Sequence, residues 1–165
     1  MIDAQLFTTY NQLKTKKDMI NLEQPLTTHF TLKEFLHSDT AKKLNIENTP
    51  KAYQVDNMRT LCNNVLEPLR KEFGKIVITS GFRSVALNKA VGGVLLSQHT
   101  KGEAADIRIG TPERGSKMFE WIKQNTLFDQ LIFERNRKTG SMWIHVSSKK
   151  ERKENRGEVI DMRQN

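Results

Sequence analysis

Hydrophobic positions spaced three and four residues apart predict one long helix over residues 55–73. The apolar positions of this stretch are Val55, Met58, Cys62, Val65, Leu66, Leu69 and Phe73. Their spacing matches the 3.6 residues of a helical turn, so these side chains share one face. Gly74 follows directly, and glycine commonly ends a helix.

Shorter helices are predicted on both sides of this long helix. Thr31 stands three residues before Glu34, which is the spacing of a capping box. Ser38 or Asp39 can cap the next short helix, in the stretch TAKKLN. After the long helix, the pair Thr111–Pro112 supplies an N-cap and a proline at the first helical position, followed by an apolar face.

Strands are predicted where residues alternate or where β-branched residues cluster. The four candidate segments are KIVIT, EAADIRI, DQLIFER and SMWIHVSS. Alternation puts Asp106 on the face opposite Ile107, and it puts His145 on the same face as Trp143. The polar loop NRKTG joins the last two segments, which are therefore expected to form a hairpin.

This order of elements predicts an α+β fold, with a small antiparallel sheet and helices packed on one side. A chain of 165 residues is the length of one domain. We expect an N-terminal arm or helix in residues 1–28, the compact domain in 29–148, and a charged tail in 149–165. The dense charge of the tail is typical of a solvated helix or a loose end. We expect a monomer.

The chain is basic, which favours an anionic partner. It has 27 Lys and Arg against 19 Asp and Glu, a net charge of +8. Nucleic acid, a membrane surface and an anionic wall polymer all satisfy this charge. We find no basic helix interleaved with aromatic residues, so no specific nucleic-acid binding is expected.

The N-terminus indicates a protein that is not exported by a standard signal. It lacks a basic segment followed by an apolar run, and no stretch approaches the length needed to cross a bilayer. We therefore expect a soluble product without a signal peptide or a transmembrane segment.

Candidate metal ligands are His99, Asp106 and His145. With Cys62 as the single cysteine, the chain has no internal disulfide and no cysteine-rich zinc cluster, so zinc must be held by histidine and carboxylate. Two imidazoles and one carboxylate suit zinc and leave a fourth position open, as hydrolysis requires. Gly102 lets the backbone turn between the first two candidates. By spacing alone, such residues are more often ordinary surface or hydrogen-bonded side chains than metal ligands.

The motifs around these residues resemble a known family. SQHTKGEAADI fits the pattern Ser-x-His-x-x-Gly-x-Ala-x-Asp, with ITSGFRS upstream and WIHVS downstream. Together they resemble the D-alanyl-D-alanine carboxypeptidase-type zinc peptidases, whose fold is related to hedgehog and lysostaphin-type domains. The resemblance covers roughly residues 29–148, and HFTLKEF and FDQLIFE are most similar to the phage endolysin branch.

The resemblance implies roles for individual residues. His99, Asp106 and His145 match the ligands of one zinc ion. Arg83 matches an arginine that faces the substrate, where its planar fork can bind a carboxylate or the oxyanion formed during attack. Ser97 and Gln98 precede the first ligand and are secondary candidates for substrate contact.

The chain departs from the family pattern at the catalytic base. Many members carry Glu or Asp three residues before the last histidine, where this chain has Met142, which cannot accept a proton. Glu134 is the replacement expected from the phage-type branch, and Asp129 is a second acidic candidate. If Glu134 pairs opposite Trp143, it lies on the face of His145, about 7 Å away on the diagonal. Pairing with Met142 turns it to the other face.

These features predict a zinc metallopeptidase acting on bacterial peptidoglycan stems. The family implies cleavage at a D-Ala-D-Ala end or at an L-Ala-D-Glu link, and the carboxylates of the stems suit a basic protein. A phage-type lysin without a signal peptide would stay in the host cytoplasm until it is released to the cell wall. The alternative is a non-catalytic, zinc-containing domain that binds the cell wall, which the missing base at position 142 favours. The net charge keeps a nucleic-acid-binding protein as a third class.

Overall fold

A mixed five-stranded sheet is the centre of the molecule. The computed structural model describes residues 21–163. The strands lie in the order β1-β2-β4-β3-β5. Their bounds are β1 Ile78–Ser80, β2 Ala104–Arg108, β3 Gln130–Arg135, β4 Met142–Ser147 and β5 Glu158–Asp161. All neighbours pair antiparallel except β3 and β5, which are parallel. The predicted α+β class with a small, mainly antiparallel sheet is confirmed.

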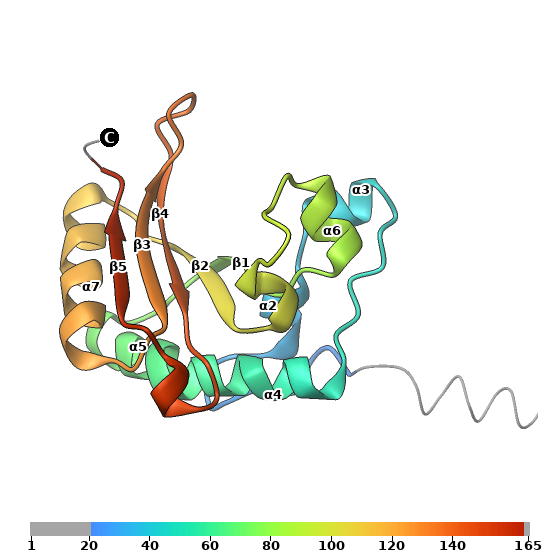
Figure 1. Ribbon diagram of the computed structural model, residues 1–165, viewed down its shortest axis with the longest axis horizontal. Coiled ribbons are helices and arrows are strands. Elements are labelled where there is room, and N and C mark those ends of the chain that lie inside the picture. The colour runs from blue at the N-terminus through green and yellow to red at the C-terminus, as the bar shows by residue number, and fades with distance from the viewer. Residues whose placement is uncertain (1–20, 164–165) are drawn as a thin grey trace, which may run out of the picture.

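Helices pack on one face of this sheet and lie beyond one of its edges (Figure 1). They are α2 Leu32–Leu36, α3 Asp39–Lys43, α4 Ala52–Leu61, α5 Glu67–Phe73, α6 Val85–Ala90 and α7 Pro112–Asn125. Two short 3-10 helices are also present, η2 Gln98–Lys101 and η3 Arg152–Glu154. Figure 1 shows α7 along one face of the sheet, with α3 and α6 beyond its β1 and β2 side. Within residues 21–163, no helix combines the length and hydropathy of a membrane span.

The predicted long helix is interrupted by one turn of π-helix. Between α4 and α5 lies η1, Cys62–Leu66, and α5 ends at Gly74, whose φ is 73°. Pro68 explains the interruption, because it has no N–H to donate and its ring clashes with the carbonyl four residues earlier. A wider turn ahead of the proline accommodates both effects. The apolar side chains still reach the core, since Met58, Cys62 and Leu69 are fully buried.

The three central strands, β2, β4 and β3, divide their side chains between a dry face and a polar face. Residues on the dry face are Ala105 and Ile107 of β2, Leu131 and Phe133 of β3, and Ile144 and Val146 of β4. They pack with Met118, Phe119 and Ile122 of α7 in one hydrophobic core. Asp106 and His145 alternate with these residues and therefore point to the opposite face.

The charged C-terminal segment is part of the sheet, which differs from the expected solvated helix or loose end. β5 pairs with β3, with Ile160 opposite Ile132. The guanidinium of Arg163 then lies over the ring of Phe133, 4.6 Å from its centre. The short β-branched pair Val159–Ile160 supplies the strand propensity, and the charged residues around it hide that signal in the sequence.

The predicted arm of residues 1–28 lies mostly outside the described residues. Within the part that is described, Pro25 forms a β-bridge with Thr31 and Leu26 is buried in the core. The capping box forms as predicted, because Glu34 accepts a hydrogen bond of 2.8 Å from the backbone of Thr31. Ser38, rather than Asp39, caps α3 by accepting from the backbone of Ala41.

Candidate metal centre

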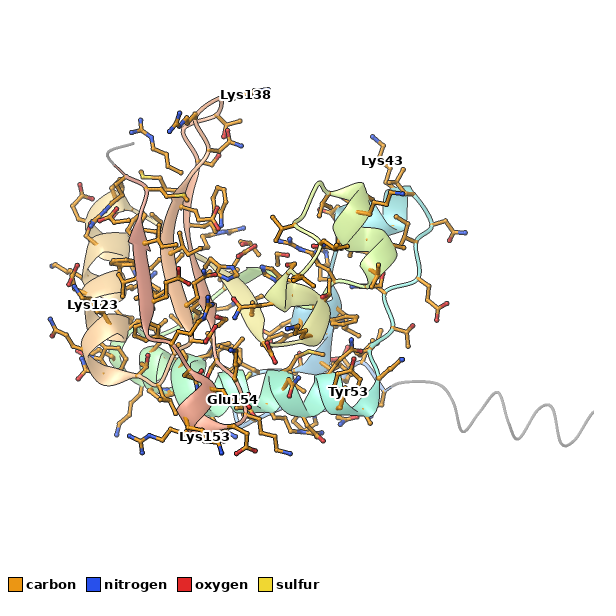
Figure 2. The ribbon with its side chains drawn as sticks, viewed as in Figure 1. Lys43, Tyr53, Lys123, Lys138, Lys153 and Glu154 are labelled. Carbon is orange, nitrogen blue, oxygen red and sulfur yellow. The ribbon has the colours of Figure 1, made fainter. Side chains whose placement is uncertain are left out.

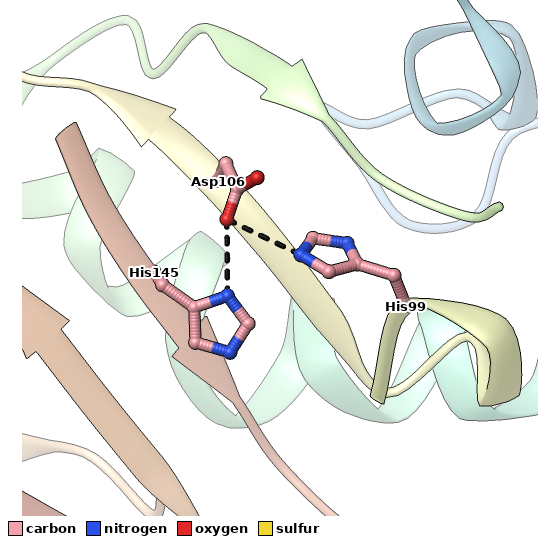
Figure 3. Close-up of side chains that lie close together, drawn as sticks. All are labelled: His99, Asp106 and His145. Carbon is pink, nitrogen blue, oxygen red and sulfur yellow. Dashed lines mark hydrogen bonds and ion pairs between the residues drawn. The ribbon is translucent and has the colours of Figure 1, made fainter. Parts of the chain in front are cut away.

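The three predicted ligand side chains lie together on the polar face of the sheet. Asp106 of β2 is directly opposite His145 of β4, and His99 reaches the same point from η2 (Figure 3). Asp106 Oδ1 lies 3.0 Å from His145 Nδ1 and 3.2 Å from His99 Nε2. All three side chains are buried. Two donors from one motif and a third that lies 39 positions after Asp106 thus converge on one point.

A glycine between the first two ligands is required by the local geometry. Gly102 has a φ of 75°, and a Cβ there would lie 2.4 Å from the backbone oxygen of Gln54. The close approach lets the side chain of Gln54 donate to the Thr100 carbonyl at 2.8 Å. This contact fixes the end of η2 against α4 just before β2 begins. The sequence expectation for Gly102 therefore has a physical basis in both backbone conformation and space.

Partners behind the ligands orient two of them. His99 Nδ1 lies 2.7 Å from the Gly81 carbonyl oxygen, so Nδ1 carries the proton and Nε2 faces Asp106. Arg83 donates from Nη2 to Asp106 Oδ2 at 2.9 Å and from Nε to Ser80 Oγ at 3.0 Å. Partners of this kind hold ligands in place and set the histidine tautomer.

Electrostatics favour a charged carboxylate at Asp106 and a neutral imidazole at His99. Burial alone would raise the pKa of Asp106, but the adjacent His99 and His145 outweigh burial and hold it well below its usual range. Burial lowers the pKa of His99, against the opposing effect of Asp106. A deprotonated carboxylate and a neutral imidazole are the forms that bind metal ions.

This donor set fits zinc. The ligand atoms of His99, Asp106 and His145 all lie within 4.8 Å of one another. Zinc bonds of about 2.0–2.1 Å put tetrahedral ligand atoms roughly 3.4 Å apart, so only small adjustments are needed. Nitrogen and oxygen donors with no cysteine match the ligands of catalytic zinc sites, where a fourth position stays free.

Glu134 lies in the same groove as the three donors. The groove has a volume of about 570 Å³, and its walls include Arg83, Gln98, Glu134 and Trp143. β3 pairs with Glu134 opposite Trp143 and Ile132 opposite His145. This register puts Glu134 on the face of His145, which is the arrangement required of a base. Burial raises the pKa of Glu134, and the negative charge of Asp106 raises it further.

The other predicted site residues have partners of their own. Ser97 is buried beside the groove, and its carbonyl accepts a bond of 2.7 Å from the Thr100 hydroxyl. Gln98 Nε2 donates to Asp129 Oδ2 at 2.6 Å, so that end of the amide is already engaged. Asp129, the second candidate for the base, is fully buried and paired with Arg156. Arg156 also lines the groove, and no motif in the sequence signals it.

Four lysines of the described residues lie far apart on the surface. Figure 2 shows Lys43, Lys123, Lys138 and Lys153 at widely separated points of the molecule. Several basic side chains are also paired, as in the contact of 2.9 Å between Arg59 and Asp56.

Comparison with known proteins assigns the chain to a family. Residues 28–147 match the family described as Peptidase M15. None of the curated proteins searched matches the chain. The matched region covers well over half of the sequence and includes the ligand turn, all three clustered donors and Glu134. The protein therefore belongs to the M15 family of zinc peptidases, the D-Ala-D-Ala carboxypeptidase type.

Proposed function

We propose that this protein is a zinc-dependent peptidase that hydrolyses peptide bonds in bacterial peptidoglycan stems. The bond is either a D-Ala-D-Ala end or an L-Ala-D-Glu link, and the context is that of a phage-type lysin. The observation that carries the proposal is the position of Glu134 in one groove with three convergent metal donors. The net charge of +8 supports a substrate that bears free carboxylates.

His99, Asp106 and His145 would hold the zinc ion. Zinc, when bound, lowers the pKa of water towards neutrality and polarises a carbonyl group. Asp106 contributes a negative charge, and Arg83 restrains it through Oδ2. The Gly81 carbonyl restrains His99 through Nδ1, which leaves Nε2 for the metal. These contacts to Asp106 and His99 hold both ligand side chains in position for metal binding.

Glu134 would act as the general base. Its carboxylate would take a proton from the attacking water and pass that proton to the leaving amine. Burial and the charge of Asp106 raise its pKa, which makes it a stronger base than an exposed glutamate. Asp129 is less suited, because hydrogen bonds from Arg156 and Gln98 outweigh its burial and hold its pKa low.

Arg83 would bind the substrate with the part of its guanidinium that is not engaged. Nε and Nη2 are taken by Ser80 and Asp106, and among the described residues Nη1 has no hydrogen-bond partner. A donor next to the metal donors can stabilise the oxyanion of the tetrahedral intermediate or hold a stem carboxylate. Ser97 and Gln98, which also line the groove, would contact the peptide backbone of the stem.

A Glu134→Gln variant tests catalysis directly. We expect loss of about 10²- to 10⁴-fold in the rate of muropeptide release from purified peptidoglycan, because glutamine cannot accept the proton. Mass spectrometry of the released fragments also identifies the bond that is cut. Glu72→Gln is the matched control, since Glu72 is an exposed glutamate on α5, outside the groove.

Two results would count against the proposal. Unchanged release by Glu134→Gln would remove Glu134 from the mechanism. No release by the zinc-loaded native protein would favour the alternative, a zinc-containing wall-binding domain, for which Met142 at the usual position of the base is the main argument.

A further inference from the structure

Asp129 is the centre of a buried polar cluster next to the metal donors. It lies just before β3, and its side chain is 0 % exposed. Its Oδ1 accepts from the backbone N–H of Arg156 at 3.0 Å, and its Oδ2 accepts from Arg156 Nη2 at 2.7 Å. Oδ2 also accepts from Gln98 Nε2 at 2.6 Å. A buried carboxylate is stable only when it is paired and hydrogen-bonded in this way.

The cluster joins two segments that are distant in the sequence. Arg156 precedes β5, in the segment that follows the residues matched by the family. Figure 1 shows this segment leaving β4, passing through η3 and returning beside β3. It is held there by the backbone as well, since the N–H of Glu158 donates to the Asp129 carbonyl at 2.9 Å. The C-terminal segment therefore runs beside β3, and its residue Arg156 lines the groove.

Gln98 begins the turn that carries a metal donor. It is the first residue of η2, and His99 follows it. The end of η2 is held by α4, where Gln54 and Asn57 donate to the carbonyls of Thr100 and Lys101 at 2.8 and 2.9 Å. The contact from Gln98 to Asp129 holds the beginning of the same turn. The turn is thus fastened at both ends, by two different parts of the molecule.

We infer that the C-terminal segment positions the metal-binding turn, through the contacts of Arg156 with Asp129 and of Asp129 with Gln98. Arg156 is a positioning residue, because it acts on His99 only through these two side chains. The inference rests on the proposed zinc site and adds to it a part of the chain outside the family match. The tail is on this account a component of the site rather than an appendage.

Zinc affinity of Arg156→Ala tests the inference. We expect the dissociation constant for zinc to be about tenfold higher than that of the native protein. This is the lower end of the effect of residues that hold metal ligands in place. The measurement is competition with a chromophoric chelator at neutral pH. Cobalt substitution adds a second readout, because loosening of His99 changes the visible absorption of the bound cobalt. Arg156→Lys should restore part of the affinity, since one charged donor remains.

Arg163→Ala is the matched control. Arg163 lies in the same segment, also pairs with an aspartate, Asp161, and packs on Phe133. Its loss should reduce the stability of the metal-free protein without changing zinc affinity or the cobalt spectrum. An equal loss of zinc affinity in both variants would mean that the segment acts only by general stabilisation, and the inference would be overturned.

A double-mutant cycle completes the experiment. If Arg156 and Gln98 act along one path, Arg156→Ala combined with Gln98→Ala weakens zinc no more than the stronger single variant. Additive losses, or native affinity in Arg156→Ala, would overturn the inference while leaving the proposed function intact. Absence of zinc binding by the native protein would instead overturn the proposed function, so the two failures are distinguishable.

Discussion

Phe133 and Glu134 are neighbours on β3, yet they belong to two different regions of the molecule. Phe133 is fully buried on the dry face, where its ring meets Phe119 with 5.6 Å between centres. Glu134 is half-buried on the polar face and lines the groove. Because side chains alternate along a strand, one register fixes both the core and the site. Substitutions on the two faces should therefore separate stability from chemistry.

The largest effect is expected from the dry face. Phe133→Ala should lower the free energy of unfolding by about 3–5 kcal/mol, through lost burial and the cavity that remains. Ile132→Ala, on the groove face and only half-buried, should cost clearly less. Urea denaturation of the zinc-free variants measures both. Similar losses at the two positions would show that the faces do not differ as described.

A smaller effect should distinguish two glycines with the same backbone conformation. Gly102 and Gly140 have φ values of 75° and 74°, but a Cβ at Gly140 would meet no atom within 4 Å. Gly140→Ala should cost about 1–2 kcal/mol for the left-handed conformation alone. Gly102→Ala should lower the free energy of unfolding by more than this, because the Gln54 carbonyl must move. Of the two variants, only Gly102→Ala should weaken zinc binding. Denaturation and chelator competition report the two outcomes.

The smallest effect is a change in acid stability at Asp129. Although burial opposes it, the hydrogen bonds from Arg156 lower the pKa of Asp129 in the folded state. The folded protein then binds fewer protons than the unfolded chain, so this stability is present above about pH 3.9 and is lost as pH falls further. When unfolding is followed from pH 6 to 2, the free energy of unfolding should fall less steeply in Arg156→Ala than in the native protein. Parallel curves would contradict this pairing.

The features that sequence could predict are those set by local periodicity. Alternation placed Asp106 on the face opposite Ile107 and His145 on the face of Trp143, each within its own strand. In the structure these faces coincide, and Asp106 Oδ1 lies 3.0 Å from His145 Nδ1 and 3.2 Å from His99 Nε2. The position of Glu134 depended on hairpin register, and the sequence left two registers open. The structure has the one with Trp143 opposite Glu134. Register depends on packing across the whole sheet, so one strand could not decide it.

The features that sequence missed have two different causes. The π-helical turn had a visible signal in Pro68, which the hydrophobic period overrode. The pairing of Arg156 with Asp129 had none, since it joins residues that lie 27 positions apart. The pairing of Arg83 with Asp106 is of the same kind, across 23 positions. Contacts of this sort depend on tertiary structure, and a single sequence does not encode them in any local pattern.

Zinc titration of the metal-free protein, compared with that of Asp106→Ala, tests the central claim most directly. Isothermal titration calorimetry of the native protein should give one bound zinc per chain. A chelator should remove this zinc, and peptidase activity should be lost with it. Asp106→Ala should remain folded and lose most of this affinity, because the carboxylate contacts both imidazoles. Equal, tight binding of zinc by the native protein and by Asp106→Ala would contradict the account.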